Sequence, residues 1–179
     1  MRNPRELGSI TPSSRFLTRA VADAIDVESA TRIAELGPGT GVFTRALLER
    51  LGPDGSLVAV DTNLDFIELL RREIADPRFT AVHGSAEVLP AILAEHGLAE
   101  VDAVVSGIPY SLLPKPVTAG ILRAARQSLA AGGRFVGYQY SPYLRPFLKS
   151  VFGNVRYRFV PLNVPPAFVY HSERRPAER

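Results

Sequence analysis

The chain contains no cysteine, which excludes disulfide bonds, thiolate metal sites and a cysteine nucleophile. Its three histidines lie far apart and lack the spacing of metal ligands, so we expect no metal centre. No apolar run approaches the roughly 18 residues that a membrane-spanning helix requires, and the N-terminus lacks the hydrophobic stretch of a signal peptide. These features favour a cytoplasmic protein.

What is present is enough for one globular domain. The 179 residues are 46% apolar, which supports a sizeable core rather than disorder. There is no internal repeat or low-complexity segment. We expect a single domain over residues 1–179, in which a basic N-terminal lead-in and an amphipathic helix (residues 1–25) precede the core (residues 26–179).

A glycine-rich turn organises the chain. Residues 33–36 form a short apolar run typical of a buried parallel strand, and Gly37, Gly39 and Gly41 follow at alternate positions. Glycines are needed where the backbone turns with positive φ or where a ligand touches the main chain. Asp61 comes 20 residues after Gly41, at the end of a second apolar strand, where doubly wound folds hold ribose hydroxyls. The pattern predicts a nucleotide-type site.

The remaining chain alternates between strand and helix patterns. Further strands are expected at residues 79–83, 101–106 and 134–140, and a final hairpin at 154–160 and 167–171. Helices are expected at residues 13–25, 42–51, 64–75, 88–96 and 115–130, the last one ending at Gly132 and Gly133. Residues 141–152 form a second stretch that mixes basic and apolar residues.

The turn has the form E-x-G-x-G-x-G rather than the G-x-G-x-x-G of dinucleotide enzymes. It resembles the S-adenosylmethionine motif of class I methyltransferases. The resemblance implies that the glycines pass the methionine part, that Asp61 takes the ribose hydroxyls and that Ser85 and Ala86 contact the adenine. The implied cofactor residues are Ser14, Glu35, Gly37, Pro38, Gly39, Thr40, Gly41, Asp61, Thr62, Ser85, Ala86, Ser106 and Gly107.

Over nearly its full length the chain resembles bacterial phospholipid N-methyltransferases, which convert phosphatidylethanolamine towards phosphatidylcholine. The motifs that carry this are TPSSR (residues 11–15), ELGPGTGVFT (35–44), VVSGIPY (104–110) and NVPPAFVY (163–170). The resemblance implies an α/β, Rossmann-like class I fold for the core (residues 26–179). Its sheet has seven strands, mostly parallel, with a C-terminal antiparallel hairpin and helices on both faces.

The GIPY sequence after the fourth strand also resembles the ribosomal RNA adenine-N6 dimethyltransferases, which have asparagine at the first position. In those enzymes the asparagine side chain and the proline carbonyl accept hydrogen bonds from the target amine. Gly107 supplies no side-chain acceptor here, which counts against adenine methylation. Those enzymes also usually add a C-terminal helical domain, for which this chain has no residues left.

Methyl transfer to an amine requires the neutral amine, whose ammonium form resembles lysine, with a pKa of roughly 10. Tyr110 is our candidate to hydrogen-bond the amine, while Tyr138 and Tyr140 offer aromatic faces for methylated ammonium groups. These three are the predicted catalytic residues. The predicted substrate-binding residues, among them two candidates for the lipid phosphate, are Ile108, Pro109, Tyr143, Arg145 and Lys149.

Charge is uneven along the chain, at +3 for residues 1–20, −6 for 21–133 and +6 for 134–179. Basic ends above the cofactor favour an anionic partner, either a lipid surface or nucleic acid. The helix within residues 1–25 can pack on the sheet, cover the cofactor or lie on a membrane, and we favour a lid over the cofactor whose outer residues also touch a membrane. We expect a phospholipid substrate and an anionic membrane, with the protein peripheral to the inner face of that membrane. The alternatives are a ribosomal RNA adenine-N6 methyltransferase and a cofactor-binding module without catalysis.

Overall fold

A seven-stranded sheet runs through the molecule, with strand order β3-β2-β1-β4-β5-β7-β6. The computed structural model describes residues 15–175. The first five strands pair in parallel, and β7 runs antiparallel to both β5 and β6. The strands are β1 (Arg32–Leu36), β2 (Ser56–Asp61), β3 (Phe79–His83), β4 (Val101–Ser106), β5 (Leu129–Gln139), β6 (Arg156–Val160) and β7 (Ala167–Glu173). The expected sheet, with its antiparallel C-terminal hairpin, is confirmed.

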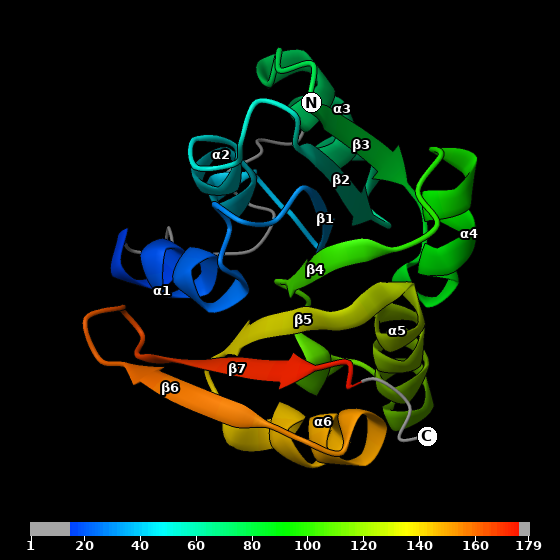
Figure 1. Ribbon diagram of the computed structural model, residues 1–179. Coiled ribbons are helices and arrows are strands. Elements are labelled where there is room, and N and C mark those ends of the chain that lie inside the picture. The colour runs from blue at the N-terminus through cyan, green and yellow to red at the C-terminus, as the bar shows by residue number, and fades with distance from the viewer. Residues whose placement is uncertain (1–14, 176–179) are drawn as a thin grey trace.

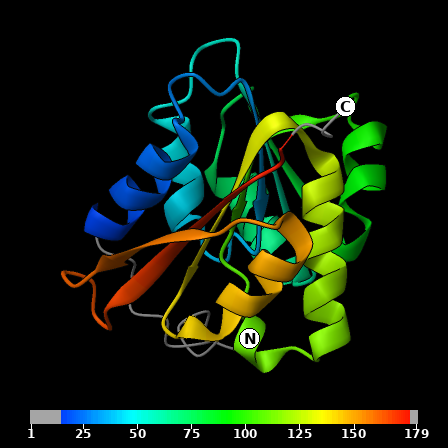
Figure 2. The same ribbon diagram turned by 60° about the horizontal axis from the view of Figure 1, so that its bottom comes forward.

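Helices cover both faces of the sheet (Figure 1). Figure 2 shows α1 and α2 on one side of the sheet and α5 and α6 on the other. The helices are α1 (Arg15–Ile25), α2 (Val42–Leu48), α3 (Leu64–Glu73), α4 (Leu89–Glu95), α5 (Lys115–Ser128) and α6 (Arg145–Phe152). Short 3₁₀ turns precede three helical segments, namely η2 (Ala86–Val88), η3 (Tyr110–Leu112) and η4 (Pro142–Leu144).

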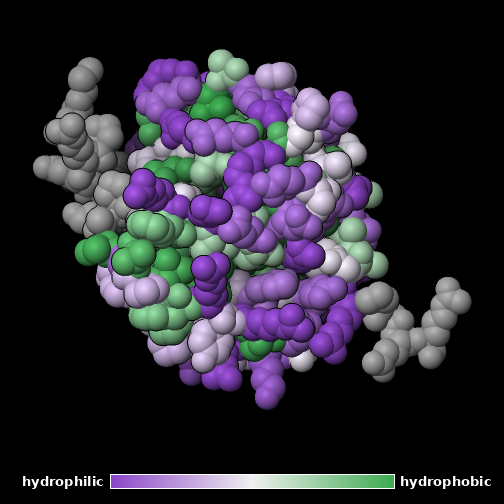
Figure 3. All heavy atoms as spheres, turned by 60° about the vertical axis from the view of Figure 1, so that its left-hand side comes forward, coloured by the Kyte–Doolittle hydropathy of each residue, from purple (hydrophilic) through white to green (hydrophobic). Residues whose placement is uncertain are grey.

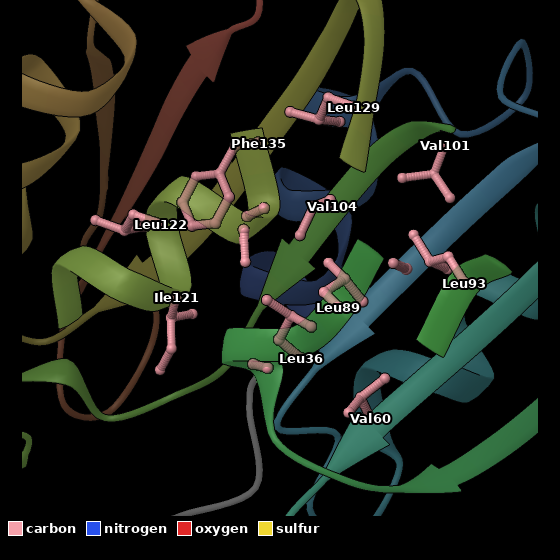
Figure 4. Packing of buried hydrophobic residues seen from close by; sticks show 14 of the residues in the cluster. Leu36, Val60, Leu89, Leu93, Val101, Val104, Ile121, Leu122, Leu129 and Phe135 are labelled. Carbon is pink, nitrogen blue, oxygen red and sulfur yellow. The ribbon is translucent and has the colours of Figure 1, made fainter. Parts of the chain in front are cut away.

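Two large apolar clusters hold these layers together, one on each face. The cluster on the α4–α5–α6 face includes Leu36, Val104 and Phe135, which are fully buried (Figure 4). The cluster on the α1–α2 face includes Leu17, Ile33 and Val105, also fully buried. Neighbouring residues of β1 and β4 point into opposite clusters. The central strands are therefore apolar on both sides, which explains their continuous hydrophobic runs.

β1 and β4 are neighbours in space although two strands separate them in sequence, so the strand order reverses between them. In open parallel sheets this reversal leaves a crevice at the carboxyl ends of the strands. Leu36 pairs with Ser106, and Ser106 pairs with Gly137 on β5. The glycine turn, the segment after β4 and the end of β5 consequently meet at one edge, which we call the cofactor edge.

The prediction for the end of α5 is wrong. The helix stops at Ser128 and β5 begins at Leu129, so Gly132 and Gly133 lie within the strand rather than after a helix. The Gly132 N–H donates to the Arg174 carbonyl at 2.8 Å, and the Arg174 N–H donates to the Gly133 carbonyl at 2.9 Å. Pairing with the chain after β7, together with a register shift against β4, extends the strand. β5 also ends at Gln139, one residue before the expected Tyr140.

None of the helices within residues 15–175 is long and apolar enough to cross a membrane.

Candidate active site

The glycine turn joins β1 to α2 and packs directly on the segment after β4. Gly37, Gly39 and Gly41 have φ values of 69°, 54° and 82°, in the left-handed region that favours glycine. The Gly37 N–H donates to the Val60 carbonyl at 2.9 Å, which ties the turn to β2. A Cβ on Gly37 would lie 3.1 Å from Ile108 Cγ1 and 3.3 Å from the Ile108 nitrogen. The turn therefore needs glycine both for its conformation and for this contact.

Other members of the predicted cofactor set are placed around this turn. Pro38 is buried within it, whereas Thr40 is exposed and its carbonyl accepts a hydrogen bond from Arg45 Nη1 at 2.8 Å. The space where a Cβ on Gly39 would stand is open to 4 Å. This combination of an open backbone at Gly39 and a tight one at Gly37 fits a ligand that lies against the main chain. Ser14 lies outside the described residues.

The Glu35 side chain is buried and hydrogen-bonded to α2. It is 2% exposed, and its Oε2 accepts a hydrogen bond from Thr44 Oγ1 at 2.7 Å. Burial raises the pKa of Glu35 to about 7, although the Thr44 hydrogen bond opposes the shift and the charge of Asp61 adds to it. The pair joins β1 to the first turn of α2. Thr44 was not among the predicted site residues, although it lies in the first turn of the expected helix after the glycine turn.

The ends of β2 and β3 place Asp61 beside Ser85. Asp61 Oδ1 accepts a hydrogen bond from the Asn63 N–H at 2.9 Å, and the Asp61 carbonyl accepts one from the Gly84 N–H at 2.9 Å. The carboxylate is partly exposed and held by this local turn. Ser85 caps η2, since its Oγ accepts from the Glu87 N–H at 3.2 Å.

Thr62 and Ala86 differ in how much surface they offer at these strand ends. Thr62 is exposed, and its carbonyl lies 3.1 Å from His83 Nε2. Ala86 is 6% exposed and belongs to the core cluster on the α4 face. Almost all of the Ala86 side chain is packed against the protein, and its contact with the adenine stays a prediction.

The prediction for Tyr110 requires a correction. Its ring is fully buried in the core on the α4–α5 face, and its hydroxyl lies 2.9 Å from Ser106 Oγ, also buried. Burial raises the pKa of the Tyr110 hydroxyl. Two predicted site residues thus bind each other inside the protein. Tyr110 fixes the loop of Ile108 and Pro109 and has no exposed surface with which to meet an amine.

Tyr138, another of the predicted catalytic residues, lies with its ring against α2 and its hydroxyl beside Gly107. Its ring stacks on Phe43 of α2, with centroids 4.3 Å apart and planes at 21°. A Cβ added at Gly107 would lie 2.5 Å from the Tyr138 hydroxyl oxygen and 2.9 Å from the Gly37 carbonyl oxygen. The hydroxyl therefore stands in the space that a side chain at position 107 would need. Burial, and then the charge of Glu35, raise the pKa of Tyr138.

Gln139 completes the wall beside Tyr138. Its side-chain amide donates to the Ile108 carbonyl at 2.8 Å and to the Tyr138 carbonyl at 2.7 Å. These bonds lock the segment after β4 to the end of β5. Tyr140 follows outside the strand and is 40% exposed at the cofactor edge. No pattern in the sequence singles out Gln139, because a lone polar residue inside a strand is common.

The predicted substrate residues after β5 divide between two sides of α6. Tyr143 packs on Phe147, with ring centroids 5.3 Å apart, and lines a mainly apolar hollow of about 570 Å³ that Lys115 borders. Arg145 instead places its guanidinium 5.5 Å from the centroid of the Tyr157 ring on β6. Lys149 lies one turn after Arg145 and is exposed. Tyr143 and the two basic residues therefore do not form one cluster.

Known methyltransferases are similar to this chain. The family described as "Methyltransferase domain" matches residues 33–133. The ornithine lipid N-methyltransferase of Singulisphaera acidiphila is 34% identical over 92% of this chain and 86% of its own. The ribosomal RNA small subunit methyltransferase A of Parasynechococcus marenigrum is 39% identical, but over only 54% of this chain and 30% of its own.

Solved structures show the same fold. The 16S rRNA methyltransferase RsmC of T. thermophilus, in complex with AdoMet and guanosine, superposes with a TM-score of 0.70 at 22% identity. The match covers 95% of this chain and 45% of that chain.

Proposed function

The chain belongs to the methyltransferase domain family and uses S-adenosylmethionine, and on that premise we propose that it methylates the primary amine of a membrane lipid. Phosphatidylethanolamine is the substrate that we propose first, in one or more steps towards phosphatidylcholine. The amine of an ornithine lipid is the second candidate, favoured by the similarity to the Singulisphaera acidiphila enzyme over nearly the full chain.

The cofactor would be held along the cofactor edge. The backbone of the glycine turn would carry the methionine part, Asp61 the ribose hydroxyls, and Ser85 the adenine. When bound, S-adenosylmethionine would supply the methyl group of its sulfonium, which the amine attacks in line while the sulfur leaves as the thioether of S-adenosylhomocysteine. This assignment is supported by the open backbone at Gly39, by the partly exposed Asp61 carboxylate, and by their location where the strand order reverses.

The observation that carries the choice of substrate is the Tyr138 hydroxyl above Gly107. An asparagine at 107, as adenine methylation would use, has no room there, because its Cβ would also meet the Gly37 carbonyl at 2.9 Å. In place of an asparagine side chain, the site would offer the Tyr138 hydroxyl to the reacting nitrogen. One hydroxyl suits a small aliphatic amine, whereas a planar base needs acceptors fixed on its edge.

Tyr138 would position the reacting amine. Its raised pKa keeps the hydroxyl neutral at physiological pH, so it accepts a hydrogen bond from the amine and directs the nitrogen lone pair. The neutral hydroxyl is no base, and the proton of the ammonium therefore leaves to water before transfer. The stacked Phe43 holds the ring in place. Tyr140 lies beside it and would offer an aromatic face to methylated ammonium products.

The lipid tail would leave the site over the hollow lined by Pro142, Tyr143, Pro146 and Phe147. This hollow follows the end of β5 directly, and its apolar side chains suit an acyl chain or the glycerol backbone. Lys115 at the border of this hollow would approach the headgroup phosphate. The basic C-terminal part of the chain fits an anionic membrane surface.

Radiolabelled S-adenosylmethionine tests the proposal. The protein is incubated with vesicles containing phosphatidylethanolamine, with vesicles containing ornithine lipid, and with deproteinised ribosomal RNA at the same salt concentration. We expect label in one or both lipids and its loss in Asp61→Ala. Label in RNA alone would overturn the lipid proposal. Measured cofactor binding without transfer to any of the three would favour the binding module.

A further inference from the structure

The turn between β6 and β7, residues 161–166, lies at the cofactor edge. Phe168 near the start of β7 pairs with Gln139 at the end of β5, and Ala167 pairs with Val160 at the end of β6. Strands in a sheet are about 4.8 Å apart, so β7 lies roughly 14 Å from β1. The turn therefore projects beyond the same edge at which the glycine turn and Tyr138 lie.

The turn presents two large apolar side chains to solvent. Leu162 is 63% exposed and Val164 is 73% exposed, whereas Asn163 between them is 1% exposed. Asn163 Nδ2 donates to the Pro165 carbonyl at 2.7 Å. The polar side chain of Asn163 therefore points inward and stabilises the loop, while its apolar neighbours point into solvent. In an ordinary surface turn the polar side chains are the exposed ones. This arrangement gives the NVPP part of the sequence motif a physical meaning.

Further apolar and basic side chains adjoin the turn. Leu162 lines a hollow with Phe16 and Arg19 of α1 and with Arg158 and Phe159 of β6. Asp23 of α1 also faces this hollow, 3.9 Å from Arg19, but the Arg19 side chain is 82% exposed and can reach beyond it. Phe16 is 43% exposed and Phe159 is 50% exposed. Figure 3 shows hydrophobic side chains gathered on the side of the molecule where α1 and the β6–β7 hairpin lie. Apolar residues flanked by arginines match the interface of a bilayer that contains anionic lipid.

We propose that the turn 161–166 inserts Leu162 and Val164 into the boundary between headgroups and acyl chains, with Arg19 and Arg158 against the lipid phosphates. The occupant of this surface is a lipid bilayer, and the inference rests on the proposed lipid substrate. Nucleic acid would use the arginines but would leave Leu162 and Val164 in water. Docking at the turn would bring the headgroup layer to the edge where the amine must meet Tyr138.

The test compares vesicle flotation of the wild type with that of Leu162→Asp/Val164→Asp. Both side chains are largely exposed, so the fold is retained, and an unchanged affinity for S-adenosylmethionine verifies this. The matched control is Leu64→Asp/Val88→Asp, which adds the same charge at two exposed apolar positions beyond β2 and β3. Leu64 begins α3 and Val88 precedes α4, and aspartate is favourable at both helix starts.

We expect the turn variant to lose at least roughly tenfold in its partition coefficient on vesicles of phosphatidylethanolamine and phosphatidylglycerol, about 1.4 kcal/mol. The control variant should partition like the wild type. Equal partition of turn variant and wild type would overturn the inference, as would equal losses in both variants, which would indicate charge alone. A dimeric wild type that becomes monomeric in the turn variant without vesicles would also overturn it.

A second readout separates this inference from the proposed function. Short-chain phosphatidylethanolamine below its critical micelle concentration offers the amine without a membrane. The turn variant should methylate this monomeric lipid at the wild-type rate while losing activity on vesicles. Vesicle binding that depends on the turn, in a protein that methylates neither form of the lipid, would support the docking surface and overturn the proposed substrate.

Discussion

Glu35→Gln should remove a pH dependence of stability that the buried carboxyl imposes. The pKa of Glu35 is raised from 4.5 to about 7 in the folded protein. Between these two values the unfolded chain has released the proton while the folded protein still holds it. The contribution of Glu35 to the free energy of unfolding is therefore complete below pH 4.5 and is lost as the pH rises through 7.

Integrated between pH 5 and pH 8, this difference lowers the free energy of unfolding by roughly 2–3 kcal/mol. Glutamine keeps an oxygen that accepts the hydrogen bond from Thr44 Oγ1, and it does not titrate. Urea unfolding at the two pH values measures both proteins. The stability of the variant relative to the wild type should rise by this amount from pH 5 to pH 8.

Thr44→Val is the companion variant, since it retains the carboxyl group and removes the hydrogen bond that opposes the shift. Its own loss of stability between pH 5 and pH 8 should exceed that of the wild type. A stability difference between Glu35→Gln and wild type that does not change with pH would refute the reasoning, because it would mean that Glu35 is already ionised in the folded protein at pH 5.

Three further predictions concern the cofactor edge. Tyr138→Phe retains the stacking on Phe43 but loses the hydroxyl. The kcat/KM for the lipid should fall roughly tenfold, the value of one hydrogen bond, while the Kd of S-adenosylmethionine measured by calorimetry should not change. An unchanged kcat/KM would show that Tyr138 is not part of the site. Gly107→Ala places a Cβ against the Gly37 carbonyl. It should therefore lower the free energy of unfolding by about 1–3 kcal/mol and raise the Kd of S-adenosylmethionine. Wild-type values in both urea unfolding and calorimetry would contradict the close approach of Gly107 to Gly37. Asp61→Ala should raise the Kd of S-adenosylmethionine by roughly 10- to 100-fold, as expected for hydrogen bonds to a charged group; an unchanged Kd would place the ribose elsewhere.

The sequence predicted the backbone of the site better than its side chains. Apolar runs and glycine spacing located β1, its turn and Asp61, because local sequence dictates where a buried strand ends and where φ must be positive. The end of α5 was predicted too late in the sequence because Gly132 and Gly133 pair with Arg174, far along the chain, and so belong to β5. No local pattern contains that information.

The roles of the tyrosines depended on tertiary packing. Tyr110 lies four residues after Ser106, and only the 3₁₀ turn η3 directs its ring into the core to meet the Ser106 hydroxyl. Tyr138 was recognised as a candidate, but its contact with Gly107 arises from the pairing of β4 with β5. Glycine at position 107, in place of the asparagine of the adenine enzymes, leaves the space that the Tyr138 hydroxyl occupies. This relation becomes visible only when β4 and β5 are paired in register.

The lipid composition of a bacterium whose membrane holds phosphatidylethanolamine but none of its methylated forms tests the central claim most directly. The chain is expressed there, alongside its Asp61→Ala variant, and the extracted lipids are analysed by mass spectrometry. We predict phosphatidylethanolamine species that carry one or more added methyl groups in cells with the wild-type chain and their absence with the variant. An unchanged lipid profile with well-expressed, cofactor-binding protein would contradict the assignment of phosphatidylethanolamine as its substrate.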